Sequence, residues 1–411
     1  MTASGTLDSV PESRANRRRV LFWAAVLVGL ALRVTLVATS IGTNDVVWKI
    51  LWARLVRESG IAHAYALRWE LNHPPLSLLI FHWTDLTAAW IGMHYTDLLR
   101  LIQVAADMLT TAMLVAIARI RPVSPDPAIL FLLAPAAIAI SGFHCNTDST
   151  MVAFFMVAVF LLLRDRGFAA GIAFVSAVGI KIIPLFLFPF VFLLRPRLRV
   201  RFTAAVAAGL AAMFVPVVAI GGTAVLRNVF GYSGFAGKWG FPALLLTVES
   251  WVARPRTTML FRSALWYANN GKYFIAAAVL GLAWFAWRRG ADLLASVSTV
   301  LLVVLTLAPG FGIQYLLWPL PLLPWALGRK MLLVTWSTIS GYVLMTYTIW
   351  SRGFPWWYAD SIAPSPGKPL VTSIGLIVWL VIGAAAVAAS VRLLRKRNGP
   401  ALQPALERPL H

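Results

Sequence analysis

The chain has 411 residues, of which 60% are hydrophobic and only 12% are charged, and its mean hydropathy is +0.78. A soluble protein of this size carries about 25% charged residues, so the composition excludes an ordinary soluble globular protein. The net charge of +21 does not indicate nucleic-acid binding, because the basic residues are dispersed in short clusters between apolar segments. A single cysteine, Cys145, excludes an internal disulfide.

Apolar stretches of roughly 15–22 residues recur along the chain and predict an all-α, polytopic integral membrane protein with about 12 transmembrane helices. The predicted spans are 20–40, 97–118, 127–142, 149–163, 167–180, 182–195, 201–220, 272–288, 291–308, 313–328, 331–349 and 370–391. Several are short, which suits broken or tilted helices around a site. The segment 74–92 is also apolar but contains His82 and Asp85, so we expect an interfacial or re-entrant hairpin there.

The positive-inside rule tests this assignment. With a cytoplasmic N-terminus, every short cytoplasmic connection is basic, as are the two expected cytoplasmic tails at 1–19 and 392–411. Counting 74–92 as a span would invert all later loops and break the rule repeatedly. We therefore expect one transmembrane domain over 20–391 in the plasma (inner) membrane. Its large outer loops would be 41–96, with interfacial helices, and 221–271.

Groups capable of acid–base chemistry gather on the predicted outer face, whereas the predicted cytoplasmic face is nearly all arginine. The five internal histidines all fall on the outer side: His63, His73, His82, His94 and His144. Most carboxylates do so as well. A site on the extracytoplasmic face therefore fits the charge pattern.

Asp45, in the stretch TNDVVWK, directly follows the first predicted span and lies at the membrane–water boundary. A partly desolvated carboxylate there can act as a general base, because burial raises its pKa toward a useful value. The alternative is helix capping, in which Thr43, Asn44 or Asp45 begins the helix that follows. For this motif alone, capping is the commoner role.

Two polar stretches of the outer face could supply further groups. In WELNHPPLS, the two prolines fix an extended turn into an apolar helix and hold His73 at the interface, although an ordinary helix-entry turn would look the same. In GFHCNTDST, His144 and Asp148 occupy a short gap between two apolar runs. They could face a cleft shared with Asp45, or Asp148 could cap the next helix.

Residues near later breaks are candidates for binding an anion. Lys181, in GIKIIP, lies between two apolar blocks, and a half-buried lysine snorkels or pairs with a phosphate or with a carboxylate such as Asp148. Gln314 and Tyr315 lie at the outer end of a proline-rich span that could line a cavity. Five basic residues of the second outer loop could bind phosphate, although a solvated loop is the default for each: Arg227, Lys238, Arg254, Arg256 and Arg262.

Arg33 and Asp107 lie inside predicted spans, and we expect them to form an intramembrane ion pair. The chain has no Walker A sequence, no H-E-x-x-H, no G-x-S-x-G and no D-x-D. The missing D-x-D argues against a nucleotide-sugar site with a metal, and no metal-ligand spacing is present.

Taken in order, these elements resemble the glycosyltransferase C superfamily, whose members are polytopic enzymes that use polyprenyl-phosphate sugars. The ordered set is an acidic residue after the first span, an interfacial helix pair, P-P-L, the H-x-x-x-D gap, G-x-K-x-x-P and Q-Y-L-x-W-x-x-P. It covers residues 20–330. WELNHPPLS looks like the W-x-L-x-Y-P-P-L element of dolichyl-phosphate-glucose glucosyltransferases, and the later pieces look more like bacterial polyprenyl-phosphomannose mannosyltransferases. His73 stands where the former have tyrosine, so their sugar cannot be transferred to this chain.

The resemblance implies a role for several residues. Asp45 would deprotonate the acceptor hydroxyl, Asp148 and His144 would contribute to the sugar or acceptor site, and Lys181 would hold the lipid phosphate. The full set of substrate-binding candidates is His73, His144, Asp148, Lys181, Gln314, Tyr315 and Arg262.

The implied reaction moves a hexose, with mannose as the first choice, from a polyprenyl-phosphate donor to a lipid- or glycan-linked acceptor by inverting displacement. The expected partners are these two substrates and membrane lipids, without nucleic acid. No cofactor is required, although some members of the superfamily use a divalent metal. The alternative is a polytopic transporter or a flippase for lipid-linked glycans, which would more often show internal symmetry and charges near the midplane.

Overall fold

The computed structural model describes residues 12–231, 237, 239–252, 259–364 and 366–395. The fold is all-α, as expected, and 80% helical. The described residues form one small sheet, in which β1 (Gly42–Thr43) pairs in parallel with β2 (Tyr358–Ala359). This pair joins two segments from opposite ends of the sequence.

The helices differ widely in length. The long ones are α1 (Glu12–Thr39), α2 (Asp45–Leu67), α3 (Pro75–Ile91), α4 (Tyr95–Ile120), α10 (Arg199–Gly221), α13 (Met259–Arg288), α16 (Arg329–Trp350) and α17 (Lys368–Arg395). Those of intermediate length are α7 (Asp148–Leu163), α8 (Gly167–Ile180), α12 (Gly240–Val252) and α14 (Leu293–Leu307). The short pieces are α5 (Pro127–Leu132), α6 (Pro135–Ala139), η1 (Ile140–His144), η2 (Ile183–Leu187), α9 (Phe188–Leu194), α11 (Ala224–Phe230), η3 (Ile313–Leu317) and α15 (Leu323–Ala326).

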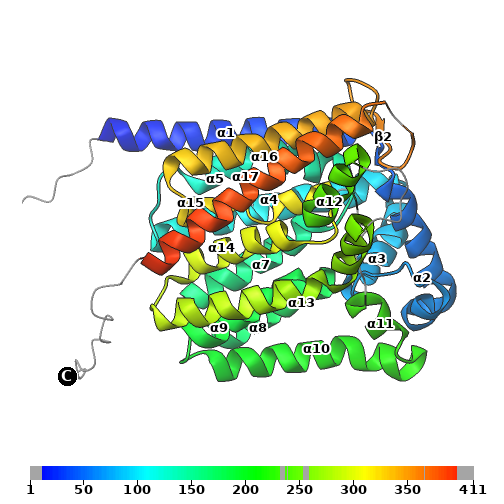
Figure 1. Ribbon diagram of the computed structural model, residues 1–411, viewed down its shortest axis with the longest axis horizontal. Coiled ribbons are helices and arrows are strands. Elements are labelled where there is room, and N and C mark those ends of the chain that lie inside the picture. Colours follow the sequence, from blue (N-terminus) through cyan, green and yellow to red (C-terminus); the bar gives the residue numbers. More distant parts are fainter. Residues whose placement is uncertain (1–11, 232–236, 238, 253–258, 365, 396–411) are drawn as a thin grey trace, which may run out of the picture.

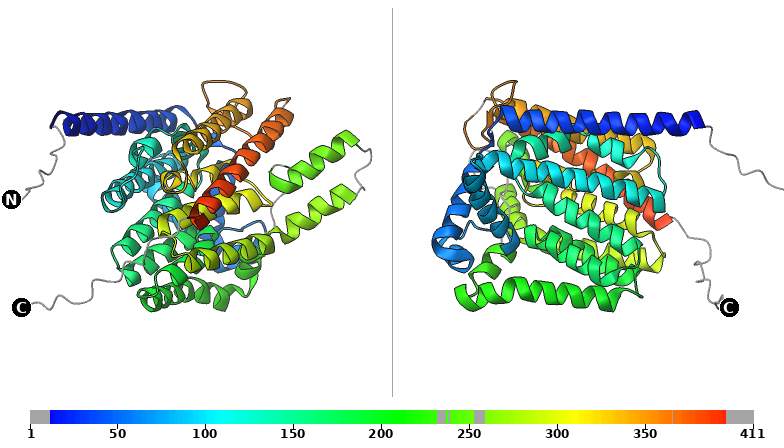
Figure 2. Two further views of the ribbon diagram at one scale, coloured as in Figure 1. Left: turned by 60° about the vertical axis from the view of Figure 1, so that its left-hand side comes forward. Right: turned by 180° about the vertical axis from the view of Figure 1, so that it is seen from behind.

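Most helices run side by side in one bundle, whereas α2 and α3 lie across one of its ends (Figure 1). Both chain termini leave from the other end (Figure 2). We call the end with α2, α3 and the β1–β2 pair the covered end, and the opposite one the terminal end. The terminal end carries the arginines that follow or close the helices α4, α9, α13 and α17, which include Arg121, Arg195, Arg288 and Arg392.

Five helical segments are long and apolar enough to cross a membrane: 19–39 in α1, and α4, α10, α16 and α17. Shorter apolar helices, among them α7, α8, α12 and α14, accompany them. The chain is therefore a helical membrane protein, but the expected count of about 12 spans is not confirmed. The segment 74–92, expected to be an interfacial or re-entrant hairpin, forms one continuous helix, α3, which is not among the candidate spans.

Proline explains why two of the predicted spans are broken, since it removes a backbone donor and clashes with the preceding turn. The segment 127–142 divides into α5, α6 and η1, with Pro135 as the first residue of α6. The segment 313–328 divides into η3 and α15, with Pro319 and Pro321 between them. The expected loop 221–271 also differs, because it contains the helices α11 and α12 and the start of α13.

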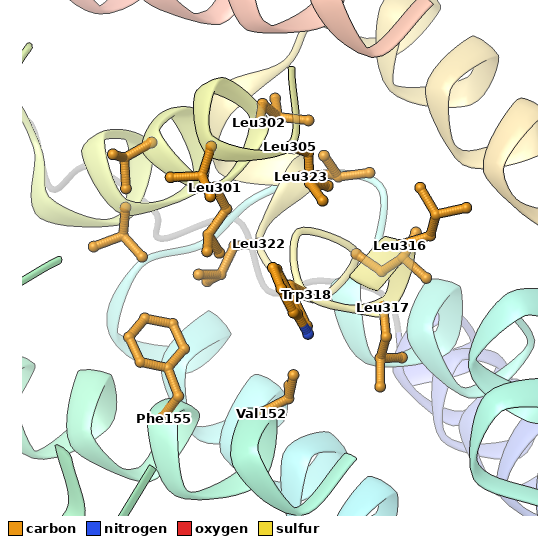
Figure 3. Close-up of a cluster of buried hydrophobic side chains, with 14 of the residues drawn as sticks. Val152, Phe155, Leu301, Leu302, Leu305, Leu316, Leu317, Trp318, Leu322 and Leu323 are labelled. Atoms are coloured by element: carbon orange, nitrogen blue, oxygen red, sulfur yellow. The ribbon is translucent and has the colours of Figure 1, made fainter. Parts of the chain in front are cut away.

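A buried apolar core lies between α7, α14 and the η3–α15 segment (Figure 3). Trp318 fills its centre and is 3% exposed, with its indole nitrogen directed toward α7. That nitrogen finds an acceptor at the start of α7, as a buried indole N–H requires. The core therefore fixes a polar contact as well as apolar packing.

The intramembrane ion pair expected between Arg33 and Asp107 is present. Arg33 Nε lies 3.0 Å from Asp107 Oδ2, and both side chains are fully buried. The guanidinium also donates to Ser141 Oγ and to the carbonyl oxygens of Gly29 and Leu132. These contacts bind α1 to α4 and to the α5–η1 region, although Arg33 Nη2 and Asp107 Oδ1 are buried without a hydrogen-bond partner.

We predict that Arg33→Met lowers the free energy of unfolding by about 3–5 kcal/mol, because it leaves the Asp107 carboxylate buried without its cation. Removing both charges in Arg33→Met, Asp107→Leu should recover most of that loss. Denaturant unfolding in detergent, followed by tryptophan fluorescence, measures both variants. A double variant no more stable than the single one would contradict the pairing energy assumed here.

Candidate active site

Asp45 is the first residue of α2 and follows β1 directly. Pairing of β1 with β2 fixes its backbone, and Asn44 Oδ1 accepts a hydrogen bond from the Ser361 backbone N–H at 3.1 Å. Of the three candidates for capping, Asn44 occupies the N-cap position, but no side chain forms a cap hydrogen bond. The capping alternative is therefore not realised. The Asp45 carboxylate, 28% exposed, turns instead toward η1 and a cavity.

A distorted turn brings partners to this carboxylate. The stretch from Ile140 to His144 is a single turn of π-helix, and Cys145 then takes a left-handed conformation with φ 63°. A π-turn adds a residue to the helix, and a left-handed non-glycine residue is uncommon. As a result His144 and Asn146 both face Asp45. Asn146 Nδ2 donates to Asp45 Oδ2 at 2.7 Å, and His144 Nε2 lies 3.4 Å from the same oxygen.

The contact between β1 and η1 is equally close in the backbone. Thr43 Oγ1 donates to the His144 carbonyl oxygen at 2.7 Å. Gly42 has φ +112°, and a Cβ there would lie 2.7 Å from the Phe143 carbonyl oxygen. Only glycine satisfies both the conformation and the space at this position.

His144 also contacts α16. Its Nδ1 lies 2.8 Å from Tyr347 Oη, and both residues are buried. A neutral imidazole with its proton on Nε2 fits both neighbours: Tyr347 donates to Nδ1, and Nε2–H points at Asp45. The tyrosine therefore orients the histidine toward the carboxylate.

A second pair lies one turn further along α2. Lys49 Nζ is 3.3 Å from His73 Nε2, and Lys49 is only 2% exposed. The ammonium also lies 4.4 Å from the centroid of the Trp52 ring. Spacing of four residues puts Lys49 and Asp45 on the same helix face. Among the described residues, no carboxylate lies within ion-pair distance of Lys49 Nζ, although Asp45 is near it on the helix.

The structure joins Lys181 and Asp148 to each other. Lys181 Nζ donates to both carboxylate oxygens of Asp148, at 2.9 and 2.8 Å, and Trp318 Nε1 donates to Oδ1 at 2.8 Å. Asp148 is fully buried and does not cap α7. Of the two partners expected for Lys181, the neighbouring carboxylate is therefore the one observed. Tyr315 completes the group, with its ring centroid 5.1 Å from Lys181 Nζ.

Charges of this cluster set the protonation states at the covered end. Burial opposes ionisation of Asp45, but the positive charge of Lys49 and the contact with His144 outweigh it, so the pKa of Asp45 falls below its usual range. Burial, together with Lys49 and Lys181, lowers the pKa of His73 well below its usual range. Asp45 is accordingly ionised at neutral pH and His73 is neutral, which lets His73 Nε2 accept from Lys49.

A cavity of about 200 Å³ opens beside Asp45. Its wall includes Asn44, His144, Phe311, Gly312 and Gln314. Lys368, at the start of α17, brings a cation to the rim and donates to the Ile362 carbonyl oxygen. An ionised carboxylate at the wall of such a cavity, held by an amide and an imidazole, is suited to accepting a proton from a hydroxyl group.

The remaining predicted residues lie in different places. Gln314 lines the cavity and is 8% exposed, and Tyr315 stacks on Trp318. Arg262, by contrast, is exposed near the start of α13 and does not line this cavity. Arg227 is not among the lining residues either. Three further basic residues predicted as phosphate contacts lie outside the described part of the chain: Lys238, Arg254 and Arg256.

Three residues of the cluster were not predicted. Lys49 could have been found, since it lies four residues after Asp45 in the same predicted helix, and Asn146 lies inside GFHCNTDST. Tyr347 carried no signal, because its hydroxyl is one polar atom in an apolar predicted span.

The covered end also contains a cysteine and several potential metal ligands. Cys145 is buried, and desolvation raises the pKa of its thiol to about 12, so it is not a nucleophile at neutral pH. Among the described residues, no group of three His, Cys, Asp or Glu side chains is placed to hold a metal ion. The expectation that no metal is required stays a prediction.

Comparison with known proteins supplies one match. The family model described as Glycosyltransferase family 87 matches residues 72–309, more than half of the chain. The matched segment contains His73, His144, Asp148 and Lys181, whereas Asp45 precedes it and Tyr347 follows it. No curated protein sequence matches the chain significantly.

We predict that Gly42→Ala lowers the free energy of unfolding by about 1–3 kcal/mol, because the new Cβ would press β1 away from η1. Gly341→Ala is the matched control, since a Cβ at that position in α16 meets nothing within 4 Å. It should be neutral or slightly stabilising. Equal destabilisation of both variants in denaturant unfolding would show that the β1–η1 contact is not tight.

Proposed function

The chain belongs to glycosyltransferase family 87, a family of membrane glycosyltransferases of the C type, and on that premise we propose its donor, acceptor and mechanism. It transfers a hexose from a polyprenyl-phosphate donor to a lipid- or glycan-linked acceptor. Mannose is the first choice of sugar, which rests on the resemblance of the later motifs to polyprenyl-phosphomannose mannosyltransferases. Family membership favours this enzyme over the transporter and flippase alternatives.

Asp45 is the proposed general base. The observation that carries this assignment is an ionised carboxylate at the wall of the cavity, bound by Asn146 and facing His144. The acceptor oxygen attacks the anomeric carbon of the sugar as its proton passes to Asp45. The bond between that carbon and the phosphate oxygen breaks, and its electron pair leaves with the polyprenyl phosphate. Direct displacement of this kind inverts the anomeric centre.

Lys49 is the proposed contact of the donor phosphate, although it is buried beside Asp45 and does not itself line the cavity. Lys181, expected for this role, already gives its ammonium to both oxygens of Asp148. The hydrogen-bonding partner of Lys49 is a neutral histidine, so a bound phosphate would be the first negatively charged partner of its ammonium. Charge matching of the leaving phosphate by a buried cation stabilises the transition state without a metal. We therefore propose that transfer requires no divalent ion.

Binding of the donor would also activate the base. Lys49 and Lys181 hold the pKa of Asp45 down in the empty site, which makes the carboxylate a weak base. A bound phosphate neutralises Lys49 and so raises the pKa of Asp45. The carboxylate thus becomes more basic only when the leaving group is in position.

The other cluster residues have supporting roles in this proposal. His144, oriented by Tyr347, faces Asp45 and contacts the acceptor or sugar, and Gln314, which also lines the cavity, contacts sugar hydroxyls. His73 positions Lys49. Asp148, Lys181 and Tyr315 support the wall through their mutual contacts, and Arg262 has no role at this cavity.

We further propose that the covered end faces the extracytoplasmic side of the plasma membrane, with both termini in the cytoplasm. Support comes from the arginines at the terminal end, which the positive-inside rule assigns to the cytoplasm. A polyprenyl-phosphate donor, unlike a soluble nucleotide sugar, is available within the membrane at that side.

We predict that Asp45→Asn lowers the rate of sugar transfer by at least about 100-fold, the usual contribution of a general base. The assay reconstitutes the protein in liposomes of native membrane lipids with polyprenyl-phosphate mannose labelled in the sugar, and follows label in new products. Asp85→Asn is the control, since Asp85 pairs with Arg57 elsewhere on the covered end. Full activity of Asp45→Asn would overturn the assignment of the base.

The donor and the stereochemistry are tested in the same assay. Labelled GDP-mannose should give no transfer, and the product should carry the anomer opposite to that of the donor. Transfer from GDP-mannose by the purified protein would refute a polyprenyl-phosphate donor. A product that retains the anomer would refute direct displacement.

We predict that Lys49→Met changes the pH dependence of kcat/KM. The reaction needs ionised Asp45, so activity falls as the pH drops through its pKa, and Lys49 holds that pKa low. Loss of the ammonium should therefore move the acidic limb to higher pH and also lower kcat/KM. Lys330→Met, at the terminal end, should leave the profile unchanged. An unshifted acidic limb in Lys49→Met would show that the two residues are not coupled.

A further inference from the structure

A second and larger cavity, of about 1050 Å³, lies at the terminal end of the bundle. It is formed where α4, α9, α13 and α17 end and where α14 and α15 meet them. The proposed reaction at the covered end makes no use of it. Its lining is basic, with Arg121, Arg195, Arg288, Arg289 and Arg392 around one carboxylate, Asp292.

The charges of this cavity are not balanced within the described chain. Asp292 accepts hydrogen bonds from the backbone N–H groups of Leu294 and Ala295, where it caps α14. None of the five arginines forms an ion pair with a described residue. Arg195 is half-buried, and burial lowers its pKa; Asp165 and Asp292 oppose this shift and Arg121 adds to it. Five arginines therefore line one hollow that contains a single carboxylate.

Membrane topology alone does not explain this arrangement. The positive-inside rule accounts for arginines at one end of the bundle, but it is satisfied wherever on that end they lie. Arg199 and Arg201, at the start of α10, satisfy it without lining the cavity. Convergence of five arginines from four segments on one hollow requires a further reason.

The walls combine charge with apolar surface. Leu194, Leu293 and Leu393 line the cavity beside the arginines, and Trp325 does so while donating its indole N–H to the Arg121 carbonyl oxygen at 3.1 Å. Guanidinium groups bind phosphate oxygens in a bidentate manner. Basic pockets between membrane helices recognise the headgroups of anionic lipids. The volume exceeds what a single phosphate group fills.

We propose that this cavity binds a phosphate-bearing anion, with the headgroup of an anionic membrane lipid as its source. The phosphate lies among the guanidinium groups, and the apolar wall receives the glycerol and upper acyl region. By bridging the ends of α4, α9, α13 and α17, the lipid stabilises the bundle. The site is separate from the proposed reaction and does not depend on it.

The test compares matched pairs of variants in which two arginines of the terminal end become glutamine. Arg195→Gln, Arg392→Gln removes charge from the cavity, and Arg199→Gln, Arg201→Gln removes the same charge outside it. Each protein, purified in a maltoside detergent, is titrated with phosphatidylglycerol, phosphatidylcholine or inorganic phosphate, and the midpoint of thermal unfolding is followed.

We call Arg195→Gln, Arg392→Gln the cavity pair and Arg199→Gln, Arg201→Gln the outer pair. Phosphatidylglycerol should raise the unfolding midpoint of the wild type and of the outer pair, and phosphatidylcholine should not. The cavity pair should require at least about tenfold more phosphatidylglycerol for the same shift, given the strength of charge-assisted hydrogen bonds. If inorganic phosphate reproduces the full shift with the same dependence on the arginines, the anion site stands and its source is soluble. Equal responses of the two pairs would overturn the proposal. If the cavity pair does not fold, Arg392→Gln alone, with an exposed side chain, serves in its place.

Discussion

Every buried cation in this bundle must have a partner, because an isolated charge in a membrane protein interior is expensive. Arg33 has Asp107, and Lys181 has Asp148, and in both cases the two charges cancel. Lys49 differs, since its hydrogen-bonding partner is a neutral histidine. The positive charge of Lys49 is therefore not cancelled by its hydrogen-bonding partner, and it acts on the neighbouring groups of the covered end. This charge lowers the pKa of Asp45, and this lysine is the cation that we propose to contact the donor phosphate.

The geometry of the base depends on backbone as much as on charge. The π-turn at η1 and the left-handed Cys145 direct two consecutive polar groups, His144 and Asn146, at one carboxylate. A regular helix through this stretch would have spread them around its circumference. Departures of this kind concentrate at functional sites, where surrounding contacts compensate their cost. Here the compensation is the tight approach of Gly42 and Thr43.

Sequence reasoning found what hydropathy and charge encode directly. It predicted the helical membrane class and the Arg33–Asp107 pair. It also named residues that converge at the covered end, among them Asp45 and His144. Its count of about 12 spans is not confirmed, and it missed α12, because apolar runs do not reveal how prolines and short helices divide a bundle. Which cation is neutralised by a carboxylate depends on side-chain contacts between distant segments, so the roles of Lys49 and Lys181 could not be separated.

The β1–β2 pair has a consequence for biosynthesis. Asn44 receives its hydrogen bond from Ser361, which lies 317 residues later in the chain. At about 5–20 residues per second, roughly 15–60 s of translation separate the two. During that time α1 and the whole central bundle can insert while Asp45 has no strand to fix it. Tyr347, which orients His144, is also made late. Until α16 and β2 have been made, the nascent chain lacks both the strand partner of β1 and the hydroxyl that orients His144. Under the proposed mechanism, shorter chains in the membrane would therefore lack an ordered base.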